Sequence, residues 1–203
     1  MISEPRTSRR ALPAALLLVW TLASGCASTS QRSFTGPEEA AVAVLTALEE
    51  GRSSEAERIY GTFTKSRTNE ELLYPVLYDA ARSRFEGGEP ARAAQVLELL
   101  VERHPTAAGS REALVYALFL ERAEQGVATP EQASRLSEAI AGLRGTSTRV
   151  VPWVDLAETQ LRIDEGRLDE ARDSFARFLG TWEGEPTSLL TYAEDLNRYL
   201  QTH

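Results

Sequence analysis

Few residues of this 203-residue chain have the types and spacing that catalysis requires. The sequence contains one cysteine, Cys26, and two histidines, His104 and His203. A zinc site needs several closely spaced Cys or His ligands, and a Ser–His–Asp triad would have to use one of these two histidines. The stretch "EGGEP" lacks the lysine and the spacing of a phosphate-binding loop. The sequence therefore predicts no enzyme activity, no catalytic residues, no metal, no cofactor and no small-molecule substrate.

The segment before the single cysteine has the layout of an export signal. Residues 1–10 carry three arginines and one acid, and residues 11–25 carry no charge. This uncharged run of 15 residues is shorter than the ~20 apolar residues that span a bilayer as a helix. A basic segment, a short apolar segment and a few small residues, in that order, are typical of a secretory signal peptide. We therefore expect residues 1–25 to be a signal peptide.

The residues around Cys26 resemble the lipobox of bacterial lipoproteins, with Ala23 at the position where leucine is commoner. The resemblance implies that Cys26 is acylated through its sulfur, that cleavage occurs before Cys26, and that its new amine is acylated too, so that covalent lipid on Cys26 takes the place of any cofactor. Because Ala27 rather than aspartate follows, it also implies an outer-membrane anchor that faces the periplasm. Two alternatives are an ordinary signal peptide with a cysteine near its cleavage site, and a twin-arginine signal at residues 8–10.

The chain that follows the signal would be acidic. Residues 1–25 hold three of the 22 basic and one of the 30 acidic residues, which leaves 19 positive and 29 negative charges and a net charge of −10. Such a charge argues against nucleic acid as a partner and against attraction to anionic lipid. Residues 26–36, "CASTSQRSFTG", are small and polar, so they predict a lipidated cysteine followed by a flexible tether.

A repeat runs through the rest of the sequence. Four glycines, Gly51, Gly88, Gly126 and Gly166, are spaced 37, 38 and 40 residues apart. Four alanines that follow them are spaced 37, 40 and 38 residues apart, namely Ala56, Ala93, Ala133 and Ala171. A recurring unit of this length is the mark of a repeat architecture, in which neighbouring units must stack to bury their apolar faces.

Apolar residues at helical spacing surround each of these glycines. Glycine favours the left-handed conformation that ends a helix, Ser53 and Thr129 suit N-caps, and Pro90 and Pro130 suit first turns. The spacing predicts an all-α chain with four helical hairpins and a last helix that caps them. The expected helices are 37–50, 53–65, 69–86, 89–103, 108–125, 130–143, 151–165, 168–180 and 186–201.

The stretches "EGGEPARAAQVLELLVERHP" and "EGRLDEARDSFARFL" resemble tetratricopeptide repeats. The resemblance implies a right-handed solenoid over residues 37–203. Because the period is long, the alternatives are long or degenerate repeats of this kind and a HEAT-like variant. In such arrays the first helix of each hairpin lines a concave groove that binds partners. By this resemblance the groove-facing residues include Tyr78, Arg82, Tyr116, Leu120, Trp153, Leu156 and Gln160. The alternative for the aromatic members is that they fill the core between helices.

These features favour a membrane-anchored scaffold or assembly factor that binds other envelope proteins through the groove. The arrangement resembles outer-membrane repeat lipoproteins such as the pilotins of secretins, and the machine could equally be of the motility or outer-membrane assembly type. The alternative is a regulator of an enzyme that acts on peptidoglycan.

Overall fold

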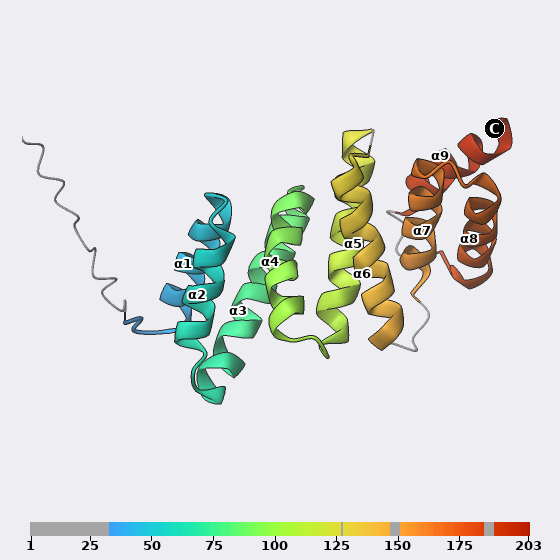
Figure 1. Cartoon of the computed structure of the whole chain (residues 1–203). Coiled ribbons are helices and arrows are strands. Elements are labelled where there is room, and N and C mark those ends of the chain that lie inside the picture. Colours follow the sequence, from blue (N-terminus) through green and yellow to red (C-terminus); the bar gives the residue numbers. More distant parts are fainter. Residues whose placement is uncertain (1–32, 127, 147–150, 185–188) are drawn as a thin grey trace, which may run out of the picture. The chain divides into compact units, whose positions relative to one another are not determined.

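In the computed structural model, all regular structure in the described residues is α-helical (Figure 1). The structure describes residues 33–126, 128–146, 151–184 and 189–203. The helices are α1 (Pro37–Glu49), α2 (Ser53–Phe63), α3 (Arg67–Glu86), α4 (Pro90–Arg103), α5 (Ala108–Gln125), α6 (Pro130–Thr146), α7 (Pro152–Asp164), α8 (Leu168–Thr181) and α9 (Leu189–Thr202). Every predicted helix is present, and its ends lie within three residues of the predicted ones. The prediction of an all-α repeat fold is confirmed.

The glycines between paired helices have the conformation that the repeat predicts. Gly51, Gly88, Gly126 and Gly166 have φ angles of 71°, 77°, 72° and 72°. The same hydrogen bond follows three of these glycines: the N–H of the next residue donates to the carbonyl oxygen five residues before it. One such bond joins Arg167 N to Arg162 O at 2.8 Å. This Schellman geometry satisfies carbonyls at the end of the helix and turns the chain into its partner.

One of the two predicted N-caps is confirmed. The Gln132 N–H donates to Thr129 Oγ1 at 3.2 Å, and the Thr129 N–H donates to Gln132 Oε1 at 3.0 Å, which is a capping box. The prediction for Ser53 was wrong, because Arg52 is the N-cap residue of α2 and provides no side-chain cap. The Schellman turn ends at Arg52, so the helix starts one residue earlier than a Ser53 cap requires.

The alanines of the repeat lie where helices approach closely. Ala56, Ala93 and Ala171 are fully buried, whereas Ala133 is only partly buried. Ala133 lies seven residues after its glycine instead of five, so the longer turn moves it out of the common register. Each hairpin packs its own two helices together, and the stack continues through contacts of α1 with α3, α4 with α5, and α7 with both α5 and α6.

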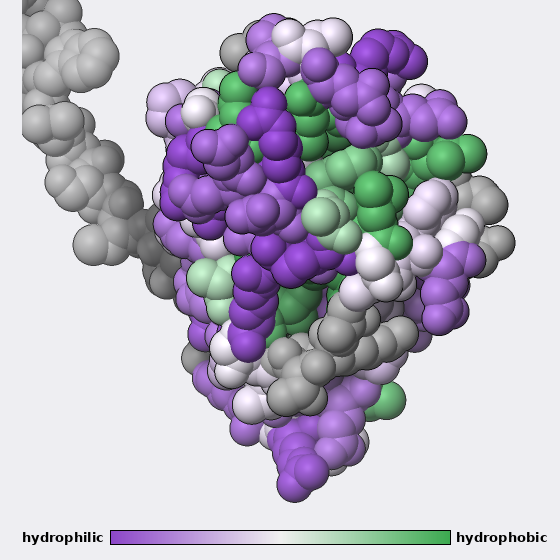
Figure 2. Space-filling model, turned by 90° about the vertical axis from the view of Figure 1, so that its right-hand side faces the viewer, coloured by the Kyte–Doolittle hydropathy of each residue, from purple (hydrophilic) through white to green (hydrophobic). Residues whose placement is uncertain are grey.

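The last helix closes the stack, as predicted. Helix α9 packs against α7 and α8, and it buries Leu189, Ala193, Leu196 and Leu200. Figure 2 faces this end of the fold and shows a largely hydrophilic surface with small hydrophobic patches. A terminal helix with a polar outer face is what a repeat array requires to remain in water.

The turn geometry gives a stability test with a matched control. We expect Gly166→Ala to lower the free energy of unfolding by about 1–2 kcal/mol, because an L-residue is strained at positive φ. A Cβ at residue 166 would meet nothing within 4 Å, so the cost is conformational and not steric. Gly61→Ala also meets no atom within 4 Å but lies inside α2, and it should stabilise the fold. Urea unfolding of both variants measures the difference; equal effects would contradict the assigned turn.

Candidate binding groove and the adjoining pocket

Three of the predicted groove residues surround one shallow hollow on α3 and α5. Tyr78, Arg82 and Tyr116 line it, together with Phe85 and small or apolar side chains of α3, α4 and α5. The hollow has a volume of about 100 Å³. Tyr78 and Tyr116 are half-buried and Arg82 is exposed, so each keeps surface that a partner could contact.

The aromatic side chains form a row across successive repeats. The ring centroids of Phe85 and Tyr116 are 5.0 Å apart, and those of Tyr116 and Trp153 are 5.8 Å apart. The Trp153 indole N–H donates to the carbonyl of Glu112 at 3.4 Å, which joins α7 to α5. Trp153 is therefore half-buried in the row, with a structural contact as well as a surface. Phe85 was missed by the sequence prediction, although it lies three residues after Arg82 on the same face of α3.

Leu156 is not a groove residue, contrary to the prediction. It is fully buried, because α7 is packed against α5, α6, α8 and α9. Leu120 is half-buried against the core, so it offers limited surface. Gln160 is half-buried and lines a second, larger pocket farther along α7. The structure thus brings Tyr78, Arg82 and Tyr116 together, with Trp153 next to them, and separates Gln160 from this group.

The charged groups that line the groove are exposed, and their ion pairs are weak. Burial raises the pKa of Tyr78 above its usual value, and the neighbouring Tyr74 and Glu112 raise it further. Arg82 lies 3.8 Å from Asp79 and 3.6 Å from Glu86, and all three side chains are exposed. Exposed ion pairs of this kind contribute little to stability. The Arg82 guanidinium can therefore exchange these partners for a group on a bound protein at small cost.

His104 has a structural role between three helices. Its Nε2 is hydrogen-bonded to the Tyr60 hydroxyl, its Nδ1 lies 3.4 Å from Glu70, and its ring meets that of Tyr74 edge-on at 4.8 Å. Burial raises the pKa of Tyr60 well above its usual value, so this hydroxyl stays protonated. The serine nearby, Ser110, is hydrogen-bonded to the Tyr74 hydroxyl at 2.6 Å. Within the described part of the chain no cluster of His, Cys, Asp or Glu could hold a metal ion.

The second pocket lies between the C-terminal halves of α5 and α7 and the face of α9. It has a volume of about 480 Å³. Arg122 of α5 and Asp164 of α7 form a bidentate ion pair in it, with 2.7 Å between Arg122 Nε and Asp164 Oδ2. Both side chains are only 10% exposed. Gln160 donates to the same carboxylate at 3.0 Å, and aromatic side chains of α5 and α9 complete the walls.

The stacked hairpins, their repeated glycine turns and the capping helix define an all-α helical repeat solenoid. The tetratricopeptide repeat family model matches residues 76–107, which hold Tyr78, Arg82 and Phe85 and the stretch "EGGEPARAAQVLELLVERHP". The chain therefore contains tetratricopeptide-like repeats, which generally mediate protein–protein interaction and typically belong to scaffolds without catalytic activity. No curated protein sequence and no solved structure shows a significant match to the chain. None of the helices in the described ranges is long and apolar enough to cross a membrane.

Proposed function

We propose that this protein is a lipid-anchored scaffold of the bacterial outer membrane, facing the periplasm, that binds another envelope protein in its groove. The observation that supports partner binding is the row of half-buried aromatic rings beside the exposed Arg82, spread over α3, α5 and α7. The lipid anchor rests on the lipobox-like residues around Cys26. Aromatic residues and arginine are the side chains that most often dominate protein interfaces. The partner would belong to a secretin, pilus, motility or outer-membrane assembly machine.

The proposed tether would end before Phe34, because the residues from Phe34 onward belong to the folded unit. Cys26 and the signal at 1–25 lie outside the described residues, but residues 34–36 belong to the folded unit. Phe34 packs edge-on against Phe63 at 6.3 Å, and the Thr35 N–H donates to Glu39 Oε2 at 2.9 Å. A tether of residues 27–33 would have an rms reach of about 13–16 Å. The first hairpin would then stay close to the membrane surface.

The lipid anchor is tested by Cys26→Ser. We expect the variant to lose labelling by a palmitate analogue and to leave the membrane fraction, because stable anchoring needs the acyl chains that the thiol and the new amine would carry. Ser30→Ala, in the same tether, is the control and should behave as the parent chain. If Cys26→Ser kept both its label and its membrane recovery, the anchor would not be at this residue.

The groove is tested by Arg82→Glu, measured on the partner recovered by affinity capture from detergent-solubilised envelopes. We expect binding to weaken by about tenfold or more, which is about 1.4 kcal/mol, because the variant replaces an arginine at the centre of the proposed interface by a residue of opposite charge. The melting temperature should stay unchanged, since Arg82 is exposed and its ion pairs are weak. Arg58→Glu is the control, because Arg58 is also an exposed arginine but lies on α2. Equal losses in the two variants would place the interface elsewhere.

A further inference from the structure

The larger pocket offers a recognition site that the groove argument does not use. Its volume of about 480 Å³ is enough for a long side chain or a small ligand. Polar side chains that line it bond to one another, because the Asp164 carboxylate accepts hydrogen bonds from Arg122 and from Gln160. The charge of Arg122 is therefore neutralised where it is buried, and the pair presents no net charge to an occupant.

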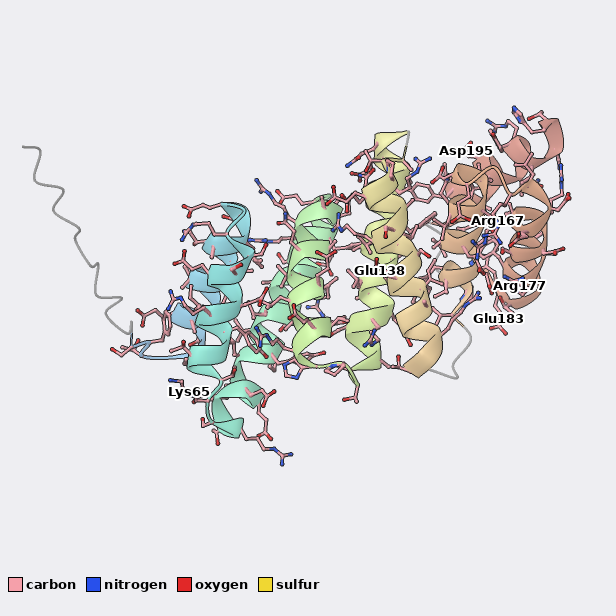
Figure 3. All side chains as sticks on the ribbon, viewed as in Figure 1. Lys65, Glu138, Arg167, Arg177, Glu183 and Asp195 are labelled. Atoms are coloured by element: carbon pink, nitrogen blue, oxygen red, sulfur yellow. The ribbon has the colours of Figure 1, made fainter. Side chains whose placement is uncertain are left out.

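The walls of the pocket are aromatic and its surroundings are acidic. Phe119 of α5 and Tyr192 and Tyr199 of α9 line it, with the Phe119 and Tyr192 rings 5.5 Å apart. Asp195, in the middle of α9, also lines it, and Figure 3 labels this residue near the upper end of α7. Burial raises the pKa of Tyr192, and the carboxylate of Glu124 raises it further, so negative charge acts on this wall.

The occupant that matches this chemistry is a cation with a long apolar stem. An aromatic wall attracts a guanidinium or ammonium group to its ring faces, and an acidic rim adds to that attraction. Arg198 is the basic side chain paired with Asp195, at 3.4 Å, but 75% of it is exposed, so it is easily displaced. An anion would instead meet the carboxylate of Asp195 and the negative charge of Glu124.

We infer that the pocket between α5, α7 and α9 binds an arginine or lysine side chain of the protein partner that occupies the groove. The inference rests on the proposed scaffold function for the source of that side chain, but the pocket can be probed without the partner. Helices α5 and α7 contribute side chains both to the aromatic row of the groove and to the pocket, so one extended segment could engage both. The site would then select partners that carry a basic residue beyond their groove-binding part.

The test is a titration of the full chain in detergent with N-acetyl-arginine methylamide, followed by NMR of the tyrosine rings. The neutral analogue N-acetyl-citrulline methylamide is the matched probe. We expect the arginine probe to shift the Tyr192 and Tyr199 resonances saturably, and the citrulline probe to bind at least about fivefold more weakly. The inference is overturned if the two probes bind equally, or if neither shifts these rings.

Variants assign the result to the pocket. Tyr199→Leu combined with Asp195→Asn should weaken the arginine probe by about fivefold or more, whereas Tyr199→Phe keeps the ring and should stay within about twofold. Asp169→Asn, on the fully exposed side of α8, should change nothing. Arg82→Glu should leave probe binding intact, so failure of the groove proposal and failure of this one give different results. An effect of Asp169→Asn equal to that of the double variant would show attraction to net charge alone and overturn the inference.

Discussion

Asp164→Leu is expected to lower the free energy of unfolding by about 3–5 kcal/mol, because it leaves the Arg122 guanidinium buried without its partner. The pair links α5 to α7 across two hairpins, and both side chains are 10% exposed, so solvent screening is small. For a chain of this size the loss corresponds to a fall in melting temperature of about 6–20 °C. Circular dichroism at 222 nm during heating measures it.

The double variant Arg122→Met, Asp164→Leu is the control for this effect. Replacing a buried ion pair by apolar side chains of similar volume is often neutral or stabilising, since neither charge then has to be desolvated. We therefore expect the double variant to recover most of the stability that Asp164→Leu loses. If the double variant were as unstable as the single one, the loss would come from packing at the end of α7 and not from an unpaired charge.

Ala171→Trp should cost at least about 3 kcal/mol and could prevent folding of the last hairpin, because a fully buried position in a close helix contact must then hold an indole ring. Ala176→Trp lies five residues later on α8 at an exposed position, and it should change the free energy of unfolding by less than about 0.5 kcal/mol. Urea unfolding of the two variants compares the same substitution in the same helix. Similar midpoints would contradict the repeat register that places Ala171 in the contact.

The helices could be predicted from the sequence because their ends carry local chemical marks. Glycine at positive φ, proline in a first turn and the Thr129 cap are decided by residues within one turn of the chain. The buried faces were harder to assign where the spacing allows two answers. Val42 lies six residues before the buried Leu48, two steps of three residues along the helix, but it is 63% exposed, and Leu190 is 46% exposed while its neighbour Leu189 is buried.

The site was less predictable because it depends on contacts between distant elements. Helix α7 is enclosed by α5, α6, α8 and α9, so even the groove position of Leu156 is covered. The same enclosure buries Glu158 of α7, which is held by Arg144 at 2.6 Å and by Arg177 at 2.7 Å (Figure 3 labels Arg177). The larger pocket exists only because α9 meets both α7 and the side chain of Phe119. No local pattern in the sequence indicates which helices α9 packs against.

The central claim is that a protein partner occupies the groove on α3 and α5 in the cell envelope. Site-specific photo-cross-linking in living cells tests it most directly, with a benzophenone amino acid placed in turn at Arg82 and at Glu138. Glu138 is an exposed residue on α6 and is labelled in Figure 3. We predict a cross-linked product of one defined mass from position 82 and none of that mass from position 138. The same product from both positions, or a product from position 138 alone, would contradict the account.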